Sequence, residues 1–88
     1  MEGETHFFAG NLDAAIAAFQ QAVALAPDDA ALWSEMARIQ VYSSTLQITD
    51  EEKANRLAEA LASIDRAIAV APDDSTSHAV RAFVLSWY

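Results

Sequence analysis

The chain is short and acidic. Its 88 residues fit one domain or a piece of one, which excludes a two-domain enzyme. Thirteen acidic residues against five basic ones give a net charge of −8, which repels nucleic-acid phosphates and anionic lipids alike. Alanine contributes 20 residues, while Gly and Pro occur twice each, so the composition favours helix over strand.

The lack of cysteine and the distribution of charge along the chain exclude further kinds of site and segment. The absence of cysteine removes disulfides, thiolate metal sites and cysteine nucleophiles, but leaves the compartment open. Residues 1–12 carry two Glu and no basic residue, which is unlike a signal peptide. The longest uncharged apolar-biased run, 14 residues at 14–27, is too short to span a bilayer. The compartment is therefore unassigned, and cytoplasmic by default.

The first predicted elements are a short helix over residues 2–9 and a longer one over 12–26. Gly10 is expected to cap the end of the first helix, and Asn11 the start of the second. The second helix has an amphipathic spacing of large apolar side chains and, beside it, a stripe of small ones that a neighbouring helix can approach closely. The large residues are Leu12, Ile16, Phe19 and Val23, and the small ones are Ala15, Ala18 and Ala22.

This second helix recurs later in the chain. Residues 12–29 match residues 57–74 at nine of 18 positions, a shift of 45 residues, and both copies end in Ala-Pro-Asp-Asp. Proline lacks an N–H and disfavours helix in the residue before it, so Pro27 and Pro72 should end their helices. The Asp pair after each proline supplies an N-cap oxygen for a following helix. Ala60 and Ala67 take the places of Ala15 and Ala22.

Weaker helices are expected after each turn, over residues 30–42 and 75–88. Between them, residues 43–49 form the one irregular stretch, either a tolerated insertion whose aliphatic side chains Leu46 and Ile48 pack on the core or a lip over a groove. Thr49-Asp50-Glu51-Glu52 reads as a capping box, which starts a long helix over residues 50–70. The sequence therefore predicts about five helices and no strand.

The pattern resembles the tetratricopeptide repeat, a helix-turn-helix unit of 34 residues whose cue is W-x2-L-G-x2-Y, then A-x3-F, then P. This resemblance implies an all-α solenoid of antiparallel helical hairpins. One first helix has Gln where the cue has an aromatic, and another begins with His in place of Trp. The matching segments are Ala15-x3-Phe19 with Ala22 and Pro27, Ala60-x3-Ile64 with Ala67 and Pro72, Trp33-x2-Met36-Ala37-x2-Gln40, Gly3-x2-His6, and His78 with Ala82.

The resemblance also implies a division of one domain over residues 1–88. Residues 1–29 would be a partial first repeat, 30–74 a second repeat with an insertion around 43–55, and 75–88 the first helix of a third. Such arrays normally need about three units, so a fragment of a longer chain, or pairing with a second copy, is expected. The apolar side chains expected to lack cover are Val80, Val84, Leu85, Trp87 and Tyr88.

Members of this family bind extended peptides or helices on the concave face formed by the first helices of their units. The resemblance therefore implies a non-catalytic protein-protein interaction module, in which Arg38 could pair with a carboxylate of a protein or peptide partner. Any of the aromatic positions could instead pack inside the solenoid. The positions carried over are Phe7, Phe8, Ser34, Arg38, Val41, Tyr42, Thr76, Ala79, Phe83 and Trp87.

Two other functions remain open: a scaffold that self-assembles through exposed terminal helices, giving a homo-oligomer, and the regulatory arm of a larger enzyme. The sequence has no Ser-His-Asp set, Gly-rich phosphate loop or convincing carboxylate pair, so we expect no catalysis and no cofactor. Neither His6 nor His78 is followed by a second ligand three or four residues later, which argues against a metal site. Neither nucleic-acid binding nor membrane insertion is expected.

Overall fold

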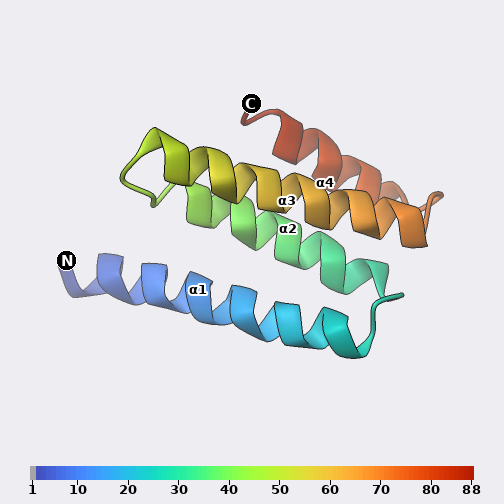
Figure 1. Cartoon of the computed structure of the whole chain (residues 1–88), viewed down its shortest axis with the longest axis horizontal. Helices are drawn as coiled ribbons and strands as arrows, with labels where there is room; N and C mark the ends of the chain where they lie inside the picture. Colours follow the sequence, from blue (N-terminus) through green and yellow to red (C-terminus); the bar gives the residue numbers. More distant parts are fainter. Residues whose placement is uncertain (1) are drawn as a thin grey trace.

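The fold consists of four stacked helices. The computed structural model describes the backbone of residues 2–88 and the side chains of residues 11–88. The helices are α1 (Glu2–Leu25), α2 (Ala30–Ser44), α3 (Asp50–Val70) and α4 (Ser75–Leu85), and no strand occurs in residues 2–88. Each helix runs antiparallel to the one before it (Figure 1), and α4 packs on both α2 and α3. The predicted all-α stack of helical hairpins is confirmed.

Both Pro-Asp-Asp turns begin where a long helix stops. The N–H of Asp29 donates to the carbonyl oxygen of Ala26, and that of Asp74 to Ala71, each over 3.1 Å. Ala71, which precedes a proline, has φ −135° and ψ 78°, outside the helical region, as the proline ring requires. The predicted ends of the two helices are therefore confirmed, and the geometry repeats with the sequence.

Side-chain caps start the helices that follow. The Asp29 carboxylate accepts the N–H groups of Ala31 and Leu32, and the Asp74 carboxylate accepts that of Thr76. The Thr49 hydroxyl accepts the N–H of Glu52 over 3.1 Å, the first half of the predicted capping box. Each cap satisfies backbone donors that have no partner inside the helix, which fixes where the helix begins.

A ring nitrogen closes each hairpin on its proline. The Trp33 indole donates its Nε1–H to the Pro27 carbonyl oxygen over 2.9 Å. At the equivalent place in the second hairpin, His78 Nε2 lies 2.6 Å from the Pro72 carbonyl oxygen. Two chemically different rings thus make the same bridge 45 residues apart. The Arg66 guanidinium also lies 5.9 Å from the Trp33 ring centroid, which ties α3 to the first hairpin.

The predicted break at Gly10 and Asn11 is wrong, because α1 continues through both residues. Neither is a helix breaker of the proline kind: both retain the N–H, and an interior glycine costs only about 1 kcal/mol relative to alanine. Ending and restarting the helix would instead leave several backbone groups without partners. The expected helices over 2–9 and 12–26 are therefore one, and α1, with 24 residues, resembles the 21-residue α3 in length.

Smaller differences occur at the other helix ends. α2 continues two residues beyond the predicted position 42, to Ser44, and α4 stops at Leu85 rather than 88. After Leu85, tighter bonds to carbonyls three residues back take over, as is common in a last turn. Ile48 is 91% exposed and Leu46 is also exposed, so the expectation that both pack on the core is wrong.

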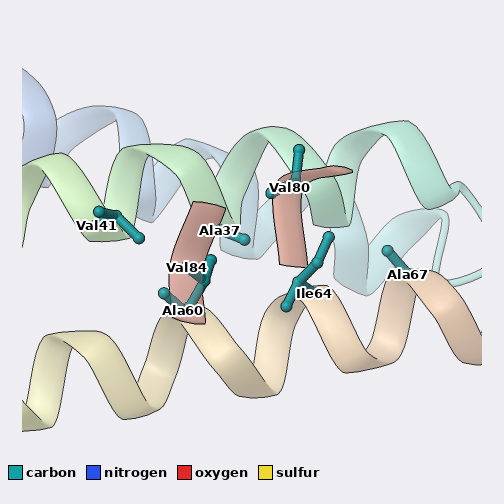
Figure 2. Packing of buried hydrophobic residues seen from close by; sticks show 7 residues of the cluster. All are labelled: Ala37, Val41, Ala60, Ile64, Ala67, Val80 and Val84. Carbon is teal, nitrogen blue, oxygen red and sulfur yellow. The ribbon is translucent and has the colours of Figure 1, made fainter. Parts of the chain in front are cut away.

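The core lies where α2 crosses α3, with α4 closing one side. Seven buried apolar side chains make it, and Figure 2 shows those of α2 and α3 directed into the same space. Three of them are alanines, whose small size lets the two helix backbones approach closely. The seven are Ala37, Val41, Ala60, Ile64, Ala67, Val80 and Val84.

Two sequence expectations about packing need correction. Val80 and Val84 were expected to lack cover, but both are buried against α2 and α3, because α4 turns this face inward. On α1, Ala18 is exposed and Ala15 and Ala22 are half-buried. The small-residue stripe of α1 is therefore covered only in part, and Ala18 is the member left open.

Two buried polar contacts join the helices. The Ser77 hydroxyl donates to the Asp74 carboxylate over 2.7 Å, and its oxygen lies 3.1 Å from the Ser34 hydroxyl of α2. Between α2 and α3, the Ser63 hydroxyl donates to Gln40 Oε1 over 2.7 Å. The hydrogen bond from Ser77 lowers the pKa of Asp74 below its ordinary value. These contacts set the register of the stack, because a shifted helix would leave buried polar atoms unpaired.

Ala60→Leu tests the close approach of α2 and α3. Ala60 is fully buried, so three additional carbon atoms should overpack the contact and lower the free energy of unfolding by about 1 to 3 kcal/mol. The matched control is Ala62→Leu, on the exposed side of the same helix, which should change it by less than about 0.5 kcal/mol. Urea titrations followed by circular dichroism measure both, and equal effects would contradict the packing described.

Asp74→Asn tests the Ser34–Ser77–Asp74 contact through pH. A carboxyl whose folded-state pKa is lowered stabilises the fold above its unfolded pKa of about 3.9, and this contribution is lost as the pH falls through the folded value. Asparagine still caps the helix but does not titrate. Between about pH 5 and pH 2.5, the variant should therefore lose less unfolding free energy than the parent chain.

The control for this experiment is Asp73→Asn, which removes the adjacent carboxyl group. No side-chain hydrogen bond to Asp73 occurs in residues 11–88, so its pH profile should follow that of the parent chain. An Asp74→Asn profile parallel to that of the parent would show that the Ser77 contact does not stabilise the fold.

Candidate functional site

The structure separates the ten residues predicted for a binding face into three groups. The side chains of Phe7 and Phe8 lie outside the described residues. Ser34 and Val41 are buried, Ser34 at its contact with Ser77 and Val41 in the core, so their assignment to the binding face is wrong. The remaining six are at least partly exposed: Arg38, Tyr42, Thr76, Ala79, Phe83 and Trp87.

Three aromatic rings form a continuous row across α2 and α4. The centroids of Tyr42 and Phe83 lie 5.9 Å apart, and those of Phe83 and Trp87 lie 6.3 Å apart at 84°, an edge-to-face arrangement. Phe83 is half-buried and packs on the core, whereas Tyr42 is 44% and Trp87 46% exposed. We call Tyr42, Phe83 and Trp87 the aromatic surface. In this surface the exposed rings of Tyr42 and Trp87 lie on either side of Phe83, which is anchored in the core.

Arg38 lies one helical turn before Tyr42. Its guanidinium pairs with Glu35 over 3.1 Å, and both side chains are about half exposed. The pKa of Arg38 is raised above its ordinary value, first by the Tyr42 side chain and then by Glu35. The aromatic surface is therefore bordered on α2 by a fixed positive charge, held in place by neighbours on its own helix.

A hollow of about 540 Å³ opens beside Trp87. It lies between the end of α2, the first two turns of α3, and the last residues after α4. Its lining combines aromatic and aliphatic side chains with two hydroxyls, one carboxylate and the only lysine of the chain: Ser44, Thr45, Asp50, Lys53, Ala54, Leu57, Trp87 and Tyr88. Trp87 belongs both to this hollow and to the aromatic surface, so the two are continuous.

The three residues of the aromatic surface are among the ten predicted from sequence for a binding face, whereas the hollow was not predicted. From sequence, Leu57 is only the first residue of the repeated segment 57–74, and Lys53 belongs to no predicted site. Their common site depends on how α3 starts beside the end of α4, which no local pattern encodes. A lysine one turn inside an otherwise acidic helix start was the available signal.

The core, rather than ion pairs, positions this site. Arg81 of α4 pairs with Asp65 of α3 over 3.0 Å, and Arg56 of α3 pairs with Asp13 of α1 over 3.6 Å. All four side chains are at least 30% exposed, and such pairs stabilise a protein by at most about 1 kcal/mol each. Burial of Phe83, Val80 and Val84 therefore contributes more than these ion pairs to holding α4, and with it the site, in place.

The described residues contain neither a cluster of metal ligands nor a helix that could span a membrane. His78 is engaged with the Pro72 carbonyl oxygen, and the His6 side chain lies outside the described residues. Within the part of the chain that the structure describes, no three His, Cys, Asp or Glu side chains gather in the manner of a metal site. None of its helices combines the length and apolarity needed to cross a membrane.

Comparison with known proteins gives one match. Residues 2–39, which span α1 and most of α2, match the family model of the tetratricopeptide repeat. Neither the curated proteins nor the solved structures gave a match. Repeats of this family generally mediate protein-protein interaction and typically do so without catalysis. This match covers 38 of the 88 residues, so similarity to the tetratricopeptide repeat is shown for α1 and most of α2.

Proposed function

We propose that the chain is a non-catalytic binding module whose aromatic surface holds the apolar side chains of a peptide or helix from a partner protein. The observation that carries this proposal is the row of Tyr42, Phe83 and Trp87, two of whose rings remain 44% and 46% exposed. Tyr and Trp are the residue types most enriched among energetically dominant interface positions. They contribute a large contact area at a small cost in side-chain entropy.

The placement of Tyr42 on α2, Phe83 on α4 and Trp87 directly after α4 supports the proposal. With residues 1–29, 30–74 and 75–88 taken as a partial repeat, a second repeat and the start of a third, α2 and α4 are the first helices of their units. First helices are the ones that line the binding face in the resemblance described above. α2 and α4 are also held in register by the contact between Ser34 and Ser77, which keeps the rings at a fixed spacing.

The hollow beside Trp87 lies at one end of the aromatic surface. Its volume of about 540 Å³ falls in the range of pockets that enclose a large side chain or a small ligand, about 300 to 1,000 Å³. Leu57, Ala54 and the two terminal aromatic rings would take up an apolar anchor. Lys53 lines the same hollow, so a partner carboxylate beside that anchor would gain a charge-assisted hydrogen bond.

Trp87→Ala tests the function. The probe is a displayed library of random 12-residue peptides, selected on the 88-residue chain, with affinities then measured by isothermal titration calorimetry. The selected peptides should bind Trp87→Ala about thirtyfold more weakly, the roughly 2 kcal/mol typical of a dominant aromatic contact. Trp87 follows α4, so the far-UV circular dichroism of the variant should be unchanged.

The control is Leu25→Ala, which removes an even more exposed apolar side chain from the end of α1, away from the aromatic surface. Its affinity for the selected peptides should equal that of the parent chain. Peptides that bind Trp87→Ala and the parent equally would exclude the aromatic surface as the binding site.

A further inference from the structure

The internal repeat assigns a counterpart to every residue of the inner α2–α3 interface. A shift of 45 residues carries residues 12–29 onto 57–74 in sequence, and the hydrogen bonds of the two turns repeat with it, so α1 corresponds to α3 and α2 to α4. The packing of α3 on α2, the most extensive in the fold, therefore has a possible repetition: a helix like α1 on the equivalent face of α4. Within the described chain that face is open.

The open face of α4 carries the counterparts of buried α2 residues. Ala37 and Gln40 of α2 are buried against α3, and their counterparts on α4 are Ala82 and Leu85. Ala82 is exposed and Leu85 is 41% exposed. This face of α4 therefore carries a small residue, Ala82, and a large one, Leu85, three positions apart. Ala37 and Gln40 have the same spacing on the face of α2 that packs on α3.

The matching face of α1 is open in part. Ala60 and Ser63 of α3 pack on α2, and their counterparts on α1 are Ala15, which is half-buried, and Ala18, which is exposed. At the end of this face, Leu25 is 88% exposed, one of the most exposed large apolar side chains in residues 11–88. α1 therefore presents the small-residue stripe that α3 buries.

The hydrogen-bonded polar pair of the α2–α3 interface has apolar counterparts on both open faces. Inside, the Ser63 hydroxyl donates to Gln40 Oε1 over 2.7 Å. At the two counterpart positions stand Ala18 on α1 and Leu85 on α4. Replacing only one partner would leave a polar group unpaired on contact, whereas replacing both leaves two apolar groups that fit each other.

The charge of α1 agrees with this match. The chain has a net charge of −8, yet residues 14–25 of α1 carry no charged side chain. Two copies of so acidic a chain repel each other over most of their surfaces. α1 offers a stretch of three turns on which a second copy meets no like charge.

We infer that copies of this chain associate head to tail, with α1 of one copy packing on α4 of the next as α3 packs on α2. The contact continues the inner helix stack across the boundary between copies. It is heterologous, because two different faces meet, and it leaves one face free at each end of every assembly. A single helix-on-helix contact belongs to the weak size class, below about 1,200 Å² of buried surface, so the association is concentration-dependent.

Two variants test the inference, each blocking one face with a charge: Ala18→Glu on α1 and Leu85→Glu on α4. Both side chains are exposed, so both variants should fold, which circular dichroism verifies. Sedimentation equilibrium from about 10 μM to about 1 mM should show the mass of the parent chain rising with concentration, whereas each variant alone stays monomeric. Mixed in equal amounts, the two variants should form a dimer and nothing larger, because only one open face remains on each.

Ala17→Glu is the matched control on the same helix. Its counterpart on α3, Ala62, is exposed in the inner stack, so a charge at this position should leave association within twofold of the parent. A parent chain that is monomeric at about 1 mM would overturn the inference. Association of Ala18→Glu alone to the same extent as the parent would also overturn it, since it would point to a contact between two α4 faces or to another surface.

Discussion

The close approach of α2 and α3 is the contact on which the rest of the structure depends. Ala37, Ala60 and Ala67 are all fully buried there, and no larger side chain keeps the two backbones apart. An alanine buries little apolar area by itself, so the contact gains its strength from the many atoms of both backbones that come within van der Waals range. Ile64 and Val41 fill the remaining space, and α4 can pack on both helices only because their separation is fixed.

The buried polar atoms make this arrangement specific. An alanine-lined contact alone tolerates sliding by a turn, because one alanine replaces another at nearly equal energy. Gln40 bonded to Ser63, and Ser34 beside Ser77, have partners in one register only. A slide would bury them unpaired, at a cost of about 1 to 3 kcal/mol each. The spacing of Tyr42 and Phe83 on the surface is therefore determined by hydroxyls and an amide beneath them.

The sequence predicts the parts of this fold that local chemistry decides. Proline determines where α1 and α3 end, and the following Asp where α2 and α4 start, because a missing N–H and a cap oxygen act within one turn. The prediction of a break at Gly10 is wrong because this break is not decided locally. Whether a chain turns at a glycine depends on what packs beyond it. Ser34 and Val41 were placed on the wrong side because helical periodicity gives a face but not the neighbour that covers it. The hollow at Lys53 joins three segments, and no single segment encodes it.

The two tryptophans of the chain occupy opposite kinds of environment. Trp33 is half-buried, with its indole N–H bonded to Pro27 and the Arg66 guanidinium over its ring, whereas the ring of Trp87 stands partly in solvent at the hollow. Their emission should therefore differ in wavelength and in access to a dissolved quencher such as iodide. The protein thus carries one intrinsic fluorophore within the first hairpin and a second beside the hollow, so the two would report on different parts of the fold.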